Sequence, residues 1–345
     1  MPTTDDVFAS PDRLRHAFEK GLGRLLERDT LGPFILATAN ASFEPELWNS
    51  LRPALEERFE ELSTKYRARL LGNGTIPDGD EDLTVFLKLA FLGFNSLEPT
   101  RFRQAGPWEV QFNPLRAFRP QRMSTQSVDG IRKPFNPDGF HFNKPFMEKE
   151  ILWEGILGGS EAALYYNKYP FVDRHGLLVP ERHQQHPQFL TPALHDFAWK
   201  QAARLGETLP GVGLGYNAYG AGASVNHLHL QLFVRDTPLP VADPHFVHNG
   251  GSEPYPAHCI ALDDAEETWE RIDALHRADI AYNLLYLPGR AYLLPRRIQG
   301  SFTVPDWCGT CAWYEMAGGV VTSNRELFDT LTFSDIAGLI REATI

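Results

Sequence analysis

The 345-residue sequence is poor in cysteine and contains no long apolar run. Its three cysteines, Cys259, Cys308 and Cys311, are too few for a disulfide framework. Because no run of about eighteen apolar residues occurs, we expect no transmembrane helix. The first residues, MPTTDDVFASPDRLR, are acidic and lack the apolar core of a signal peptide. We therefore expect no secretory signal and a cytoplasmic location.

Positive charge is also scarce, because 33 lysines and arginines face 44 aspartates and glutamates, for a net charge of −11. This balance argues against a general nucleic-acid binder, although a nucleotide substrate needs only a local positive pocket. A hydrophobic content of 43% and a charged content of 22% are ordinary for a soluble globular protein. We expect small-molecule partners, with neither nucleic acid nor a membrane among them.

The chain does contain a stretch, GYNAYGAGASVNHLHLQLFV from Gly215 to Val234, in which histidines alternate with leucines. Read as a strand from residue 226, it places His227, His229 and Gln231 on one face. The opposite face carries Asn226, Leu228, Leu230 and Leu232. One face can therefore enter a core while the other offers two imidazoles and an amide to a ligand.

Glycine precedes this predicted strand, at Gly220 and Gly222, and is followed by Ser224. Successive amides in such a loop can form a nest that binds an anion, which suits a phosphate ester. A neutral histidine beside it can attack phosphorus and carry the nucleotidyl group as a phosphoramidate. The alternatives for an isolated H-x-H pair are a metal site or two hydrogen-bonded core histidines. The glycine-rich loop and Gln231 favour the phosphate interpretation.

The stretch resembles the signature of the histidine-triad (HIT-like) superfamily. Its hydrolase branch has three alternating histidines, whereas glutamine takes the third position in the transferase branches, which match Gln231. The resemblance implies that His229 is the nucleophile and that Asn217 and Ser224 touch phosphate. Asn226 is a further phosphate-binding candidate. The local N-H-L-H-L-Q sequence is most similar to the GDP-hexose phosphorylases.

Two more stretches extend the resemblance. Residues 140–144, F-H-F-N-K, resemble a segment that enters the core of the GDP-hexose phosphorylases. The phrases N-K-Y-P, at 167–170, and H-G-L-L-V-P, at 175–180, resemble diadenosine tetraphosphate phosphorylases. In that family the matched lysine lies near the phosphates, which makes Lys168 a lesser candidate for phosphate binding. The alternative is an ordinary surface lysine.

The pattern along the chain predicts three parts. Residues 1–100 form a helical N-terminal extension, with apolar residues at helical spacing in 14–25, 44–71 and 83–94. Residues 101–235 form the catalytic half, and 236–345 form a second, degenerate half without H-x-H-x-Q. A weak repeat of 165–180 in 281–296 supports two similar halves. The resemblance implies an α+β fold, a pseudo-dimeric HIT-like antiparallel sheet with helices.

Three further motifs have open interpretations. The basic cluster R-A-F-R-P-Q-R, at 116–122, suits phosphate oxygens, but a solvated loop is the alternative. The acidic stretch D-G-D-E-D, at 78–82, indicates a solvated turn rather than a calcium loop. The pair Cys308 and Cys311 is half of a zinc site, with a redox pair or unliganded thiols as alternatives. We predict no metal, with these two cysteines as the weaker candidates.

The sequence therefore predicts a nucleotidyltransferase of the phosphorylase type that needs no cofactor. His229 attacks the α-phosphorus of a nucleoside diphosphate ester, and the His227 imidazole orients the nucleophile or a phosphoryl oxygen. Gln231 binds a non-bridging oxygen of the intermediate. Because an amide cannot act as an acid or base, Gln231 fits transfer better than hydrolysis. The preferred substrates are a GDP-hexose and inorganic phosphate, which yield GDP and hexose 1-phosphate. Alternatives are a dinucleoside polyphosphate phosphorylase or adenylyltransferase, a nucleotide hydrolase, and a non-catalytic nucleotide-binding protein.

Overall fold

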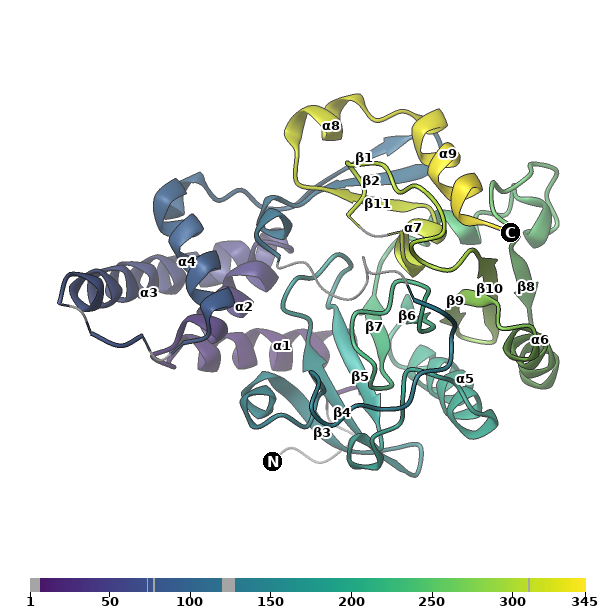
Figure 1. Cartoon of the computed structure of the whole chain (residues 1–345), viewed down its shortest axis with the longest axis horizontal. Helices are drawn as coiled ribbons and strands as arrows, with labels where there is room; N and C mark the ends of the chain where they lie inside the picture. Colours follow the sequence, from purple (N-terminus) through teal and green to yellow (C-terminus); the bar gives the residue numbers. More distant parts are fainter. Residues whose placement is uncertain (1–6, 73, 77, 120–127, 310) are drawn as a thin grey trace.

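The computed structural model describes residues 7–72, 74–76, 78–119, 128–309 and 311–345. A helical N-terminal region lies beside an eight-stranded sheet, and a three-stranded sheet lies above that sheet in the view of Figure 1. The predicted α+β class with an antiparallel sheet is confirmed. No helix in the described ranges is both long and apolar enough to span a bilayer.

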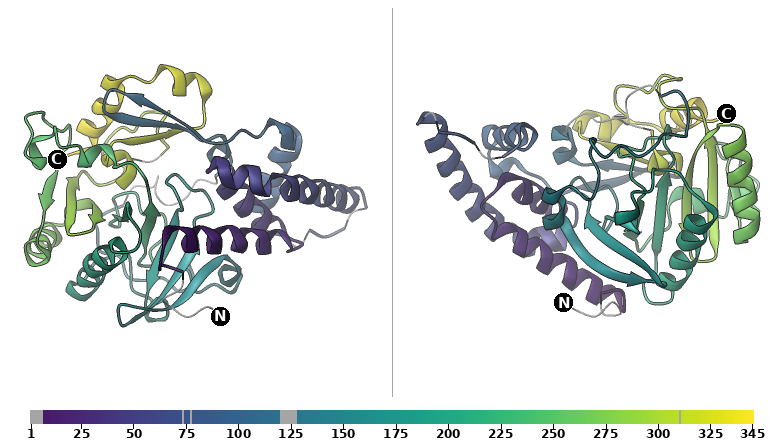
Figure 2. Two further views of the ribbon diagram at one scale, coloured as in Figure 1. Left: turned by 180° about the vertical axis from the view of Figure 1, so that it is seen from behind. Right: turned by 60° about the horizontal axis from the view of Figure 1, so that its bottom comes forward.

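The N-terminal region contains α1 (Pro11–Leu26), α2 (Leu31–Ala41), α3 (Pro45–Leu71) and α4 (Asp80–Leu92). Three of them follow the predicted helical spacing. The prediction lacks α2, because every residue of that helix is buried and no polar face gives it a 3.6-residue period. Figure 2 shows α1 running along the sheet, where the Tyr166 hydroxyl donates to the Phe18 carbonyl at 2.7 Å.

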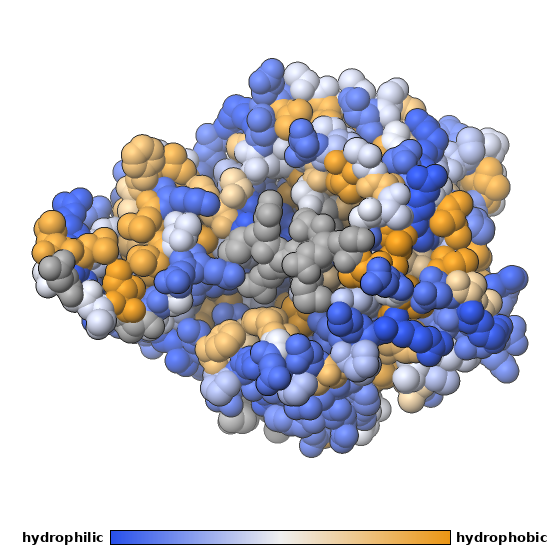
Figure 3. Space-filling view, in the orientation of Figure 1, coloured by the Kyte–Doolittle hydropathy of each residue, from blue (hydrophilic) through white to orange (hydrophobic). Residues whose placement is uncertain are grey.

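Apolar side chains remain exposed on the helical region, at the left of Figure 3. They belong to the C-terminal end of α3 and to α4. They are Leu70, Leu71, Leu87, Phe91 and Leu92.

The eight-stranded sheet has the order β3-β4-β5-β7-β6-β9-β10-β8. Its first strands are β3 (Ile151–Leu157), β4 (Ser160–Tyr166), β5 (Gly176–Pro180), β6 (Val212–Asn217) and β7 (Leu230–Val234). The others are β8 (Ile260–Leu262), β9 (Ala281–Leu287) and β10 (Arg290–Arg296). The antiparallel pairing of β6 with β9 joins strands from residues 101–235 to strands from 236–345.

Helices α5 (Pro192–Gly206) and α6 (Ala265–Arg277) pack on the sheet, α5 against β6 and β9 and α6 against β8 and β10. Each helix comes just before an antiparallel strand pair in the sequence. The pair after α5 is β6–β7, and the pair after α6 is β9–β10. The repeat of β9–β10 is therefore β6–β7, and its predicted alignment with 165–180 is wrong. The dipeptide Tyr-Asn occurs in all three segments, so only the order helix, strand, strand identifies the correct pair.

The three-stranded sheet combines residues far apart in the sequence. Strands β1 (Arg101–Ala105) and β2 (Trp108–Phe112) pair antiparallel, and β11 (Gly319–Thr322) runs parallel to β2. The short helix α7 (Trp313–Met316) precedes β11, and α8 (Arg325–Thr330) and α9 (Phe333–Ala343) follow it. The division of the chain at residues 100 and 235 stays a prediction.

Candidate active site

A cavity of about 580 Å³ lies between the helical region, the eight-stranded sheet and α7. It collects most of the predicted site residues from separate elements. Those that line it are Lys168, Asn217, Gly222, Ser224, His229 and Gln231. Three other predicted residues, Gly220, Asn226 and His227, are not part of its lining.

The two signature histidines lie just before β7 rather than inside it, because the strand begins at Leu230. The expected strand from Asn226 is therefore too long by four residues. His229 is 4% exposed, and its Nδ1 lies 2.8 Å from the His227 carbonyl oxygen. A carbonyl only accepts, so Nδ1 carries the proton and Nε2 keeps its lone pair. Burial lowers the pKa of His229 to about 4, which keeps the ring neutral near pH 7.

The His227 ring has a different position from the one predicted. It is buried outside the cavity lining, where its Nδ1 accepts from the Phe142 amide at 3.2 Å. Burial, followed by the neighbouring His229, lowers the pKa of His227 to about 3. His227 thus orients His229 through its backbone carbonyl, whereas the predicted orientation was by its side chain. Its ring instead holds Phe142, whose own ring lies 5.3 Å from that of His229.

Gln231 is oriented by a buried histidine that the site prediction lacks. The Phe171 amide donates to Nδ1 of His175 at 3.3 Å, so the ring proton is on Nε2, which lies 3.0 Å from Gln231 Oε1. Burial and the nearby Arg116 lower the pKa of His175 to about 3. With its oxygen engaged, Gln231 directs its amide NH₂ at the cavity. The sequence signals for His175 are its place as the first residue of the H-G-L-L-V-P phrase and its position just before a buried strand.

Asn217 is fixed in a similar way by residues from the second half of the chain. Its Oδ1 accepts from Asn283 Nδ2 at 2.7 Å and from the Trp313 amide at 2.8 Å. This arrangement leaves the Asn217 NH₂ as a donor for the cavity. Gln188 donates to the Asn217 carbonyl at 2.9 Å and accepts from the His229 amide at 2.9 Å. Gln188 and Asn283 are absent from the sequence prediction, because each acts across a long sequence separation.

The glycine-rich loop differs from the predicted anion nest. Gly220 and Gly222 have φ values of +81° and +91°, which suits glycine. The Gly222 amide, however, donates to Gln299 Oε1 at 3.1 Å, and the Gly220 carbonyl accepts from the Gln299 amide at 2.7 Å. Asn226 likewise braces the loop, accepting from the Gln188 amide at 3.0 Å. The loop shapes the cavity, and the expected amide nest is wrong for Gly222.

The acidic stretch 78–82 forms a wall of the cavity, and its central residues, Gly79, Asp80 and Glu81, are exposed to solvent, as predicted. Asp78 Oδ1 accepts from the Leu31 amide at 2.8 Å, at the start of α2. Asp82, in the first turn of α4, forms an ion pair with Lys168. The Lys168 charge is thus compensated within the protein. Arg116 and Arg119 of the predicted basic cluster also line the cavity, and residues 120–122 of that cluster lie outside the described residues.

The C-x-x-C cysteines are buried in an apolar cluster with Met316 and Val320. Cys311 Sγ lies 3.7 Å from Met316 Sδ, and burial raises the pKa of the Cys311 thiol to about 12. Across the described ranges, no three His, Cys, Asp or Glu side chains are grouped for a metal ion. Both thiols are thus surrounded by core side chains.

The eight-stranded antiparallel sheet and the buried histidine at its cavity agree with the predicted HIT-like fold. Residues 108–233 match the family described as "GDPGP1-like, N-terminal domain". The chain is 29% identical to GDP-D-glucose phosphorylase 1 of Bos taurus over 266 residues, which are 65% of this chain and 68% of the relative. It is 37% identical to the Homo sapiens protein of the same name over 130 residues, 35% of this chain and 33% of that one.

A solved structure supports the fold independently. The crystal structure of the yeast Ap4A phosphorylase Apa2 superposes with a TM-score of 0.50 and 18% identity, covering 78% of this chain and 96% of that one. The predicted HIT-like fold and the predicted resemblance to GDP-hexose phosphorylases are confirmed. So is the enzyme class, a nucleotidyltransferase of the phosphorylase type.

Proposed function

We propose that the protein is a cytoplasmic phosphorylase that converts a GDP-hexose, GDP-D-glucose first of all, and inorganic phosphate into GDP and hexose 1-phosphate. The observation that carries the proposal is the buried, neutral imidazole of His229. Its Nδ1 proton is held by the His227 carbonyl, so its Nε2 lone pair is available to the cavity. The relatives named GDP-D-glucose phosphorylase 1 support the choice of substrate.

In the first step, His229 Nε2 attacks the α-phosphorus. The N–P bond forms as the bond from phosphorus to the bridging oxygen breaks, and hexose 1-phosphate leaves with that electron pair. A phosphate is a good leaving group, so the step requires no general acid. The amide NH₂ groups of Gln231 and Asn217 bind the non-bridging oxygens, on which negative charge grows.

In the second step, an oxygen of inorganic phosphate attacks the phosphorus of the guanylyl-histidine. The N–P bond breaks, the electron pair returns to His229 Nε2, and GDP forms. Gln231 cannot remove a proton from water because an amide is neither acid nor base. Phosphate, already ionised at neutral pH, needs no such help. This difference favours phosphorolysis over hydrolysis, and neither step requires a metal or a cofactor.

The fold similarity to an Ap4A phosphorylase favours a second candidate, the phosphorolysis of diadenosine tetraphosphate. The same His229 chemistry would serve, with an adenosine polyphosphate as the leaving group. The sequence relatives favour the GDP-hexose, so we rank the dinucleotide second.

The test is a substrate panel of GDP-hexoses, ADP- and UDP-sugars and diadenosine tetraphosphate, each with and without inorganic phosphate. We expect phosphate-dependent GDP release from GDP-D-glucose, absent in His229→Ala and retained in His245→Ala, a change at an exposed histidine. ADP release from the dinucleotide alone would establish the second candidate. GMP release without phosphate would identify a hydrolase, and binding without turnover would identify a non-catalytic nucleotide-binding protein.

A further inference from the structure

Arg116 places a guanidinium in the cavity without a carboxylate partner. It lies in the short turn Pro114–Phe118 that follows β2, and it lines the same cavity as His229. Among the described residues, no aspartate or glutamate oxygen lies within 4.0 Å of it. A cation that is desolvated without a counter-charge is costly unless an anion binds beside it.

The protein nevertheless holds this guanidinium in one place. Its Nη1 donates to the Tyr169 carbonyl at 2.7 Å, and its Cζ lies 5.0 Å from the centre of the Phe171 ring. The Phe171 ring is in turn 4.4 Å from that of His175, which hydrogen-bonds Gln231. A continuous set of contacts thus places Arg116 on the Gln231 side of the cavity, with further N–H groups free to bind a ligand.

We propose that Arg116 binds the phosphate group of the departing hexose 1-phosphate and, after it leaves, the inorganic phosphate that enters. This inference rests on the proposed function, and it assigns the subsite of the second substrate.

The other charges of the cavity support this assignment. Lys168 is already paired with Asp82. Glu315 also lines the cavity, and its charge acts to raise the pKa of Arg116. Its Oε2 accepts from the Ala312 amide at 2.8 Å. Burial and the like charge of Arg119 lower the pKa of Arg116 to about 9. A bound phosphate dianion would stabilise the charged guanidinium, which burial and Arg119 disfavour. The planar fork of arginine also matches two phosphate oxygens.

The stereochemistry of the two steps explains why one subsite serves both. In an in-line displacement the leaving oxygen lies opposite the attacking atom. Hexose 1-phosphate therefore leaves from the side of phosphorus opposite His229 Nε2. Inorganic phosphate must attack opposite the same nitrogen in the second step, so it approaches from the position that hexose 1-phosphate has vacated. A cation at that position binds both groups in turn.

The experiment compares Arg116→Gln and Arg116→Lys with a matched control, Arg103→Gln. Arg103 also donates to backbone carbonyls, and its Cζ lies 5.6 Å from the centre of the Phe328 ring, but it does not line the cavity. We expect Arg116→Gln to raise the KM for inorganic phosphate about 10- to 100-fold, as for the loss of a charged hydrogen bond. Arg116→Lys keeps the charge and should lose less, and Arg103→Gln should leave this KM unchanged.

A direct binding measurement separates this inference from the proposed function. Inorganic phosphate should raise the melting temperature of the intact wild-type protein and of Arg103→Gln, but not that of Arg116→Gln. If Arg116→Gln does not fold, the same two readouts are taken on Arg116→Lys, where an unchanged KM and an unchanged phosphate response overturn the inference. Wild-type turnover with a normal phosphate KM in the folded Arg116 variants overturns the inference alone. The absence of wild-type phosphorolysis with any substrate overturns the proposed function instead.

Discussion

At the scale of the residue, the protonation of His229 controls the proposed first step. Burial lowers its pKa from the ordinary 6.5 to about 4, and only the neutral ring has a lone pair on Nε2. If His229 alone titrates, kcat/KM for the nucleotide sugar should therefore be constant above about pH 5 and decrease as the pH falls through about 4. The measurement is a pH profile of kcat/KM. A decrease of kcat/KM centred near pH 6.5 would show that the pKa of His229 is not lowered by burial.

The same shift affects stability. The folded pKa is depressed below the unfolded value, so the unfolded chain binds the proton first as the pH falls. The contribution of His229 to stability should be complete above about pH 6.5 and decrease as the pH falls to about 4. Urea unfolding of the wild type and of His229→Gln at pH 7 and pH 5 measures this. An equal loss of stability in both proteins would contradict it.

His227 gives a second prediction at this scale, because it orients His229 through the backbone. His227→Gln keeps the carbonyl that accepts from His229 Nδ1, and its side-chain oxygen can still accept from the Phe142 amide. We expect a loss in kcat of at most about tenfold, as for one weakened hydrogen bond. Steady-state kinetics against His229→Ala provides the measurement. Complete loss of activity in folded His227→Gln would indicate that the imidazole itself takes part.

Single residues could be predicted where the signature is local. His229 and Gln231 are two positions apart, and both line the cavity. His175, Gln188 and Asn283 could not be predicted, because they contact Gln231, His229 and Asn217 across 56, 41 and 66 positions. Asn226 and the Gly222 amide have suitable chemistry, but their hydrogen bonds are made within the protein. Only the fold determines which polar groups remain free for a ligand.

At the scale of the element, α1 contains a matched pair of glycines. A side chain at Gly21 would overlap the Tyr166 hydroxyl, whereas nothing lies within 4 Å of a Cβ at Gly23. Gly23→Ala should raise the free energy of unfolding by about 0.5–1 kcal/mol through helix propensity. Gly21→Ala should lower it by about 1–3 kcal/mol through overpacking. Denaturant titration measures both, and equal effects would mean that α1 does not pack on β4 in this way.

Elements with one polar face could be predicted, and elements without one could not. The spacing of Leu14, Phe18 and Leu22 predicts α1, and all three are buried. In contrast, α2 and β6 are buried along their whole length, so neither shows the period of its structure. Strand β6 also contains Gly213 and Gly215, and glycine is depleted in strands. That strand is nevertheless the one that joins the two halves of the sheet.

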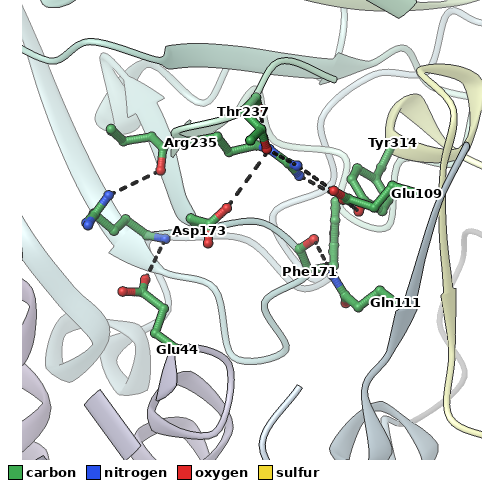
Figure 4. Close-up of polar contacts among 10 residues, drawn as sticks. Glu44, Glu109, Gln111, Phe171, Asp173, Arg235, Thr237 and Tyr314 are labelled. Atoms are coloured by element: carbon green, nitrogen blue, oxygen red, sulfur yellow. Dashed lines mark hydrogen bonds and ion pairs between the residues drawn. The ribbon is translucent and has the colours of Figure 1, made fainter. Parts of the chain in front are cut away.

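At the scale of the whole molecule, one buried ionic network joins distant parts of the chain (Figure 4). Arg235, after β7, donates to both Glu109 oxygens of β2 at 2.9 and 2.6 Å. The Tyr314 hydroxyl of α7 also donates to Glu109. Nearby, the Arg174 amide donates to Glu44 Oε1 of the helical region at 3.0 Å. The two sheets and the N-terminal helices are thus connected around the loop that carries His175.

We predict that Glu109→Gln lowers the free energy of unfolding by about 3 kcal/mol, because it removes the carboxylate that accepts two hydrogen bonds from the buried Arg235. The remaining counter-charge, Asp173, is more distant, at 4.0 Å from Arg235 Nε. The matched control is Asp263→Asn, which removes the exposed pair with Arg290 and should cost about 0–1 kcal/mol. Chemical denaturation followed by fluorescence measures both. Similar small losses in the two variants would contradict the structural importance of the network.

The general architecture of the molecule could be predicted, but not its connections. The resemblance implies two halves in one sheet, and the pairing of β6 with β9 joins them. The parallel pairing of β11 with β2 places residues 319–322 beside residues 109–112, and no local pattern indicates this contact. The same is true of the cavity wall at 78–82, because an acidic turn in a sequence carries no sign of what it faces.

The most direct measurement of the central claim is the intact mass of the protein after incubation with GDP-D-glucose in the absence of phosphate. We expect one guanylyl group, located on His229 by peptide mapping, absent from His229→Ala, and removed with release of GDP when phosphate is added. Phosphate-dependent GDP formation without any adduct would indicate direct displacement on the substrate. That result would contradict the double displacement through His229.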